Sequence, residues 1–255
     1  MKLITRTLCT WLCLAFCITA NAQMSDAASY AAYLGTADAA STNALWDKVV
    51  AQKQEAFNKN KTDNTLRWNL ALAQYGLMTA TMRTKDEDRF DKYYDETEDH
   101  LKALFKDDKF KAEAKALLSG VYGLKMGYSS MMGIVLGSKS SSLIEDALKG
   151  SPESPLVWRV EASSKMYTPE MFGGDKAEGL KAFEKSIALF EQDPASLKNN
   201  WIYLDALVFQ GRAYASEGQT AKAIQAYEKA LKAEPNFSWV KYDLLPKAKQ
   251  KALGK

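Results

Sequence analysis

Residues 207–235 read LVFQGRAYASEGQTAKAIQAYEKALKAEP and carry the clearest structural signal in the protein. Their apolar residues recur at spacings of three and four, which is the period of one face of a helix. Gly218 interrupts the pattern in the middle, and Pro235 stands at its end. The stretch therefore predicts two consecutive helices, with Gly218 ending the first, Thr220 capping the second and Pro235 stopping it.

Small residues stand where these two helices would touch. Gly211 and Ala223 allow a close approach, while Tyr214 and Tyr227 fill the space beside them. The spacing closely resembles the tetratricopeptide repeat, whose pattern is W-x₂-L-G-x₂-Y…A-x₃-F…P in helix–turn–helix form. Only the first large residue and Gln210 depart from that pattern.

Related spacings occur earlier in the sequence. Ala147-Leu148-x-x-x-Pro152 repeats the end of the unit above, and the repeat that follows it runs through Trp158 to Phe183. Ser154-Pro155 is a typical helix start, and Asp175-x-x-Glu178 has the spacing of a capping box. Trp68 to Tyr75 has a looser first-helix spacing.

The resemblance implies an all-α fold, a right-handed α-solenoid of antiparallel helix pairs in a tetratricopeptide-like superhelix. We expect about four pairs, at roughly 63–106, 109–149, 153–193 and 198–235, plus capping helices from Trp46 to Phe57 and from Ser238 to Ala252. The predicted segments are a signal peptide (1–22), an N-terminal segment with a capping helix (23–62), the repeats (63–235) and a C-terminal capping helix (236–255).

The first 22 residues have the pattern of a secretory signal peptide. Lys2 and Arg6 precede an apolar run, Leu8 to Ile18, and Ala20-Asn21-Ala22 is a small-x-small cleavage site. Cleavage after Ala22 would make the protein periplasmic or secreted. An alternative is a lipid anchor at Cys17, although the bulky Phe16 before it disfavours lipidation.

The rest of the composition is that of an ordinary globular protein. The sequence has 255 residues, 47% of them apolar, and a formal net charge of +3. The excess of basic over acidic residues is too small for a typical nucleic-acid-binding protein. No segment after the first 22 residues is long and apolar enough to span a membrane. All the cysteines, Cys9, Cys13 and Cys17, lie in the segment that would be removed, so we expect no disulfide.

No pattern of catalytic or metal-binding residues stands out. His100 is the only histidine, and a lone histidine without cysteines predicts neither a zinc site nor a serine triad. The acidic run from Asp86 to Asp99 is interleaved with basic residues and favours a solvated helix face. We therefore predict no catalytic, cofactor-binding or metal-binding residue and no cofactor, with a structural or solvated role for His100.

Two stretches with few charged residues admit two interpretations each. The run from Gly127 to Gly137 contains glycines and methionines; it favours core packing within the second pair, and the alternative is an adaptable apolar surface for a peptide or lipid tail. In the turn from Tyr167 to Gly174, we expect Phe172 to pack into the stack and Asp175 to cap the next helix. The alternative is a loop that grips a ligand.

In tetratricopeptide-like arrays the first helix of each pair lines a concave groove, and the resemblance implies that this groove binds extended peptides or partner proteins. Helical phase predicts which side chains face it. Arg159 and Arg212 could bind a carboxylate in a forked contact. The Lys/Asn set by which some family members hold the C-terminus of a partner is not matched. The predicted groove residues are Asn69, Ala73, Arg159, Ser163, Tyr167, Val208, Arg212 and Ser216.

The leading hypothesis is therefore a non-enzymatic, protein- or peptide-binding scaffold of the bacterial cell envelope. The alternative is a carrier of a hydrophobic ligand, with a pocket near Met131 in the Met- and Gly-rich second pair. A third hypothesis is an enzyme with a dispersed carboxylate site.

Overall fold

A computed structural model of the protein describes residues 24–35 and 38–254. These residues form eleven α-helices, and their only β-type pairing is one isolated bridge between Ser25 and Asn200. The predicted signal peptide and Cys17 lie outside the described residues. Within them, no helix is long and apolar enough to cross a membrane.

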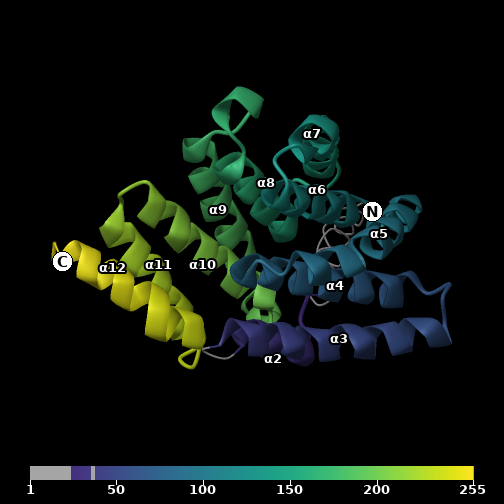
Figure 1. The fold of residues 1–255 in the computed structure, drawn as a ribbon, viewed down its shortest axis with the longest axis horizontal. Coiled ribbons are helices and arrows are strands. Elements are labelled where there is room, and N and C mark those ends of the chain that lie inside the picture. Colours follow the sequence, from purple (N-terminus) through teal and green to yellow (C-terminus); the bar gives the residue numbers. More distant parts are fainter. Residues whose placement is uncertain (1–23, 36–37, 255) are drawn as a thin grey trace, which may run out of the picture.

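The four predicted helix pairs are present, so the prediction of an all-α solenoid is confirmed (Figure 1). In each pair the helices pack against each other, and successive pairs stack in sequence order. The pairs are α4 (Asn64–Thr84) with α5 (Glu87–Ala103) and the short turn η1 (Leu104–Lys106), α6 (Lys111–Tyr128) with α7 (Met132–Gly150), α8 (Pro155–Tyr167) with α9 (Lys176–Glu191), and α10 (Trp201–Ser216) with α11 (Thr220–Ala233).

Local signals fix most of the helix starts. Ser154 accepts a hydrogen bond from the backbone of Val157 and precedes Pro155 at the first position of α8. Asp175 accepts one from the backbone of Glu178, so both predicted N-caps are confirmed. The reciprocal bond of a capping box does not form, because the backbone N–H of Asp175 donates to the carbonyl of Lys165. Thr220 is not a cap, because it is already the first residue of α11 and its backbone N–H bonds to the carbonyl of Gly218.

Close contact between the paired helices depends on glycine, as the repeat pattern predicts. A Cβ atom on Gly211 would lie 2.4 Å from the ring of Tyr227 in α11. A Cβ atom on Gly179 in α9 would lie 3.0 Å from the backbone nitrogen of Met166 in α8. Both distances are shorter than normal van der Waals contact, so any other residue would push the helices apart.

The N-terminal segment forms two helices, α2 (Ala27–Leu34) and α3 (Ala39–Lys59). The predicted capping helix is part of α3, which packs along α4, whereas α2 was not predicted. Trp46 in α3 and Tyr33 in α2 both contact Trp201 at the start of α10, with ring centroids 5.3 and 5.4 Å apart. The N-terminal segment therefore joins the first repeat to the last, and the solenoid curls until its ends meet (Figure 1).

The C-terminal cap is helical from Ser238 to Ala252, as predicted. A π-helical turn, η4 (Val240–Leu244), follows its first two residues, and it continues as α12 (Leu245–Ala252). Trp239 stands just before the π-helical turn, and its ring lies under the guanidinium group of Arg83 at the end of α4. The cap therefore contacts the first repeat as well as the last.

Candidate functional site

Arg159, one of the two arginines predicted to line the groove, is buried in the core. Arg159 is 3% exposed and forms an ion pair with Asp205, which is 0% exposed. Val208, one helical turn after Asp205, is also buried. The prediction that Arg159 and Val208 line an open groove is therefore wrong, because α2 and α4 cover this part of the concave face.

Tyrosines from the covering helices complete the bonding of this ion pair. The Tyr33 hydroxyl in α2 donates to Asp205 over 3.0 Å, and Arg159 donates to the Tyr75 hydroxyl in α4 over 2.8 Å. Burial opposes the charge on Arg159, but the neighbouring carboxylate of Asp205 raises the pKa of Arg159 above its usual value. Burial raises the pKa of Asp205 as well, opposed by the charge on Arg159. Together these four side chains link four helices.

Beside this buried layer lies a set of cations and aromatic rings that are partly or largely exposed. Arg212 in α10 lies over Phe209, with 4.8 Å from its Cζ atom to the ring centroid, and 5.6 Å from the ring of Trp239. Arg83 lies over the same Trp239 ring at 4.2 Å. Tyr167 meets Phe209 edge to face at 6.3 Å. We call this set the arginine trough: Arg83, Tyr167, Phe209, Arg212 and Trp239.

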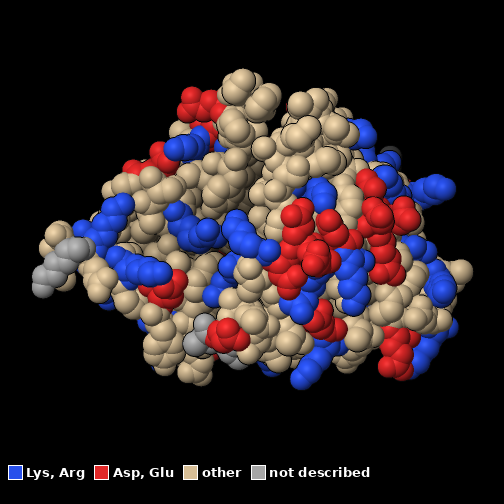
Figure 2. All heavy atoms as spheres, in the orientation of Figure 1, with Lys and Arg blue, Asp and Glu red and all other residues tan. Residues whose placement is uncertain are grey.

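The two guanidinium groups of the trough have no ion-pair partner within the described part of the protein. Partial burial lowers the pKa of Arg83, and the charge on Arg212 lowers it further, whereas Tyr33 and Asp243 act in the opposite direction. Basic side chains gather in the middle of the face shown in Figure 2, where α10 approaches the end of α4. The trough thus holds two guanidinium groups without a close ion pair beside apolar rings, a setting that favours a bound anion.

The remaining predicted groove residues are divided between the trough and its surroundings. Tyr167 belongs to the trough and Ser216 is exposed at the end of α10. The hydroxyl oxygen of Ser163 is buried and has no hydrogen-bond partner among the described residues. Asn69 is half-buried near the start of α4, fourteen residues or roughly 21 Å along the helix from Arg83, and Ala73 is buried.

Three trough residues were missed from the sequence. Arg83 lies on the same face of α4 as Asn69 and Ala73, because ten residues after Ala73 is close to a whole number of helical turns. The helical phase that predicted Asn69 and Ala73 would have predicted Arg83 as well if it had been followed to the end of the helix. Phe209 precedes Arg212 by three positions and shares its face of α10. Trp239 gave no signal, because its place depends on how the C-terminal cap folds back.

Comparisons with known proteins agree with this architecture. Residues 204–237 match the tetratricopeptide repeat family. A crystal structure of a thermophilic tetratricopeptide repeat protein from Thermus thermophilus aligns with a TM-score of 0.56 at 16% identity, over 82% of this chain and 92% of that chain. This chain therefore has a tetratricopeptide-like helical repeat fold.

Other comparisons add little to this assignment. Yeast Tom70 aligns over 84% of this chain and 60% of its own at 12% identity, but the TM-score of 0.22 is too low to support a common fold. No curated protein matches the sequence.

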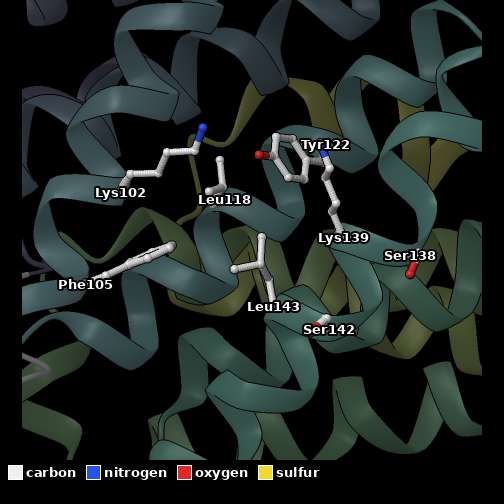
Figure 3. A pocket seen from close by; sticks show the side chains of 8 residues that line it. All are labelled: Lys102, Phe105, Leu118, Tyr122, Ser138, Lys139, Ser142 and Leu143. Carbon is white, nitrogen blue, oxygen red and sulfur yellow. The ribbon is translucent and has the colours of Figure 1, made fainter.

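The repeat array has a further hollow on another surface, between α5 and the second pair (Figure 3). It is open and has a volume of about 390 Å³. Two of its polar groups already have partners, because Lys102 and the Tyr122 hydroxyl both bond to Glu98. The lining residues are Lys102, Phe105, Leu118, Tyr122, Ser138, Lys139, Ser142 and Leu143, so the hollow is not the predicted pocket near Met131.

Two predictions about the apolar residues of the turns within the second and third pairs are wrong. Met131, Ile134 and Val135 are exposed rather than packed in the core of the second pair, although Leu136 is buried. Phe172 is exposed rather than tucked into the stack. In both cases the turn between paired helices projects beyond the neighbouring repeats, so its apolar residues find nothing to pack against.

His100 has the predicted structural role. Its ring is buried and meets Phe57 edge to face at 4.9 Å, and Arg67 lies 3.3 Å from its Nδ1 atom. Burial lowers the pKa of His100, opposed by the nearby Glu96. Within the described ranges, no group of three or more His, Cys, Asp or Glu residues is placed to hold a metal ion.

Proposed function

We propose that this protein is a non-enzymatic scaffold of the cell envelope that binds a carboxylate-bearing segment of a partner protein in the arginine trough. The observation that carries this proposal is the placement of Arg83 and Arg212, neither of which has an ion pair within the described residues, over aromatic rings. The signal-peptide pattern of residues 1–22 supports the envelope location.

The chemistry of the trough favours a carboxylate over other groups. A guanidinium group presents a planar fork of N–H donors that matches both oxygens of a carboxylate. The Cζ atom of Arg212 lies 4.8 Å from the centroid of the Phe209 ring, and that of Arg83 lies 4.2 Å from the Trp239 ring, so each guanidinium group is held beside an aromatic ring. Two arginines on different helices would fix both the position and the direction of a bound segment.

The rings also supply apolar contact beside the charges. Tyr167 is about half exposed at one end of the trough, and the partly exposed Trp239 lies at the other. A partner segment with an acidic side chain and a neighbouring apolar one would satisfy both kinds of surface. The buried layer of Arg159 and Asp205 below gives the trough a rigid floor.

Photocrosslinking in intact cells tests this proposal. A photoreactive phenylalanine analogue replaces Tyr167 in the trough, and the matched control places it at Leu253, which is exposed near the C-terminus. We expect a discrete protein adduct from position 167 that is absent from position 253 and is lost when Arg212→Glu is added. The same adducts from both positions, or adducts that survive Arg212→Glu, would contradict the proposal.

A further inference from the structure

Five large, exposed apolar side chains outside the trough lie on two neighbouring turns. Their exposed fractions range from 54% to 87%. The turn between α6 and α7, together with the start of α7, carries three of them, and the turn between α8 and α9 carries the other two. We call this set the apolar edge: Met131, Ile134, Val135, Met171 and Phe172.

The stacking of the repeats brings these two turns to one edge of the molecule. The α6–α7 and α8–α9 pairs are consecutive, α6 packs on α8, and in antiparallel pairs every intra-pair turn lies on the same side of the stack. Figure 2 shows the two turns as neighbouring lobes, largely without charged atoms, that project beyond the rest of the face. The turns of the flanking pairs are polar, with Lys85 and Asp86 in one and Glu217 in the other.

Few charged groups would have to leave water if these turns entered an apolar medium. Residues 126–138 contain no charged side chain, and Glu170 is the only one in residues 166–174. Five charged residues flank the two stretches: Lys125, Lys139, Lys165, Asp175 and Lys176. Lys125 and Lys176 form ion pairs with Asp91 and Glu217, so the charges that remain around the edge are two basic ones and, with Glu170, two acidic ones. Such a collar matches a zwitterionic surface better than an anionic one.

Much of the backbone of both turns is already hydrogen-bonded within the turn. The N–H groups of Met132, Gly133 and Ile134 donate to the carbonyls of residues 129–131. In the second turn, those of Phe172 and Gly174 both donate to the carbonyl of Pro169. Backbone groups bonded in this way need no hydrogen bond from water. A backbone that enters hydrocarbon must meet this requirement, whereas a backbone in a hydrated protein interface need not.

We propose that the apolar edge binds a lipid surface, with the side chains of both turns inserted among zwitterionic headgroups and the upper acyl chains. Two separate convex projections suit a deformable bilayer, which can close around each of them. The insertion is peripheral and leaves the arginine trough outside the lipid. This proposal does not depend on what the trough binds.

Flotation with phosphatidylcholine vesicles tests it, using the full-length protein and variants that share its N-terminal residues. The test variant carries Ile134→Ser and Phe172→Ser, one change on each turn. The matched control carries Tyr242→Ser and Leu253→Ser, which remove one aromatic and one aliphatic side chain that are 67% and 74% exposed elsewhere.

We expect the wild-type protein and the control to float with the vesicles. The test variant should bind them about tenfold more weakly or worse. Neither added salt nor anionic lipid should be required. The proposal is overturned if the wild-type protein does not float, or if the test variant floats as well as the control. It is also overturned if flotation is absent and the test changes instead abolish self-association, which would assign the edge to a second copy of the protein.

Discussion

Arg159 on α8 and Asp205 on α10, 46 residues apart in the sequence, form an ion pair that is shut off from solvent at the centre of the molecule. Tyr33 and Tyr75 close it from the N-terminal side. The arginine trough lies beside this buried pair.

Breaking this ion pair should be costly. Asp205→Asn leaves Arg159 buried without a counter-charge, and such losses reduce the free energy of unfolding by about 3–5 kcal/mol. Urea denaturation measures the change. Asp243→Asn removes one partner of an exposed pair with Lys247 and should shift the midpoint little. Equal midpoints for the two variants would show that the buried pair contributes nothing special.

Glycines in two settings should respond in opposite ways to the same substitution. Gly211→Ala places a methyl group 2.4 Å from the Tyr227 ring and should destabilise the protein by roughly 1–3 kcal/mol. Gly123 lies within α6 and has nothing within 4 Å of an added Cβ atom. Gly123→Ala should therefore be neutral or stabilising by up to about 1 kcal/mol. Thermal or urea unfolding of the two variants checks the sign of each effect.

The attachment of α2 should depend on the ring of Tyr33 more than on its hydroxyl. Tyr33→Phe loses one hydrogen bond to Asp205 and should cost about 1 kcal/mol. Tyr33→Ala also loses the contacts with Trp201 and Phe237 and should cost roughly 3 kcal/mol. Hydrogen exchange should then become faster in α2 and at the start of α10. Unchanged exchange there in Tyr33→Ala would contradict the role assigned to this helix.

Alkaline solution should weaken the fold through tyrosines that bond to glutamates. Burial, reinforced by Glu234 and Glu184 respectively, raises the pKa of Tyr30 and of Tyr214 to about 12. An unfolded tyrosine titrates near about 10, so the folded state holds these protons more tightly. Their stabilising contribution is complete below about pH 10 and is lost as the pH rises toward the folded-state pKa.

The measurement is the urea midpoint as a function of pH across this range. A variant with Tyr30→Phe and Tyr214→Phe removes two of the titrating groups, so its midpoint should fall less steeply than that of the wild-type protein. Identical slopes would show that these tyrosines do not carry the effect.

The helix pairs could be predicted because they depend on contacts between residues close in sequence. Gly211 and Tyr227 are sixteen positions apart, and the glycine, alanine and proline punctuation of each repeat reports such packing directly. Helix starts followed in the same way from Ser154 and Asp175, whose side chains bond to the next turn of backbone.

The candidate site was predicted only in part, because burial on the concave face is decided over long distances. Arg159 and Arg212 occupy the same face in helical phase, yet the first is buried because Tyr33, far away in the sequence, covers its partner Asp205. Nothing in the local pattern of α2 indicates where that helix docks. Exposure of Ile134 and Phe172 was missed for a related reason, since periodicity locates an apolar face without showing whether a neighbour reaches it.

The sharpest test of the arginine trough uses the partner that is crosslinked from position 167. The measurement is the affinity of this partner for the wild-type protein and for a variant with Arg83→Glu and Arg212→Glu. Losing hydrogen bonds to charged groups costs about 1.5–3 kcal/mol each, so the double variant should bind at least about tenfold more weakly. Lys232→Glu, an exposed charge reversal on α11, should bind normally. Equal affinities for the wild-type, double-variant and control proteins would contradict a trough that holds its partner through these two arginines.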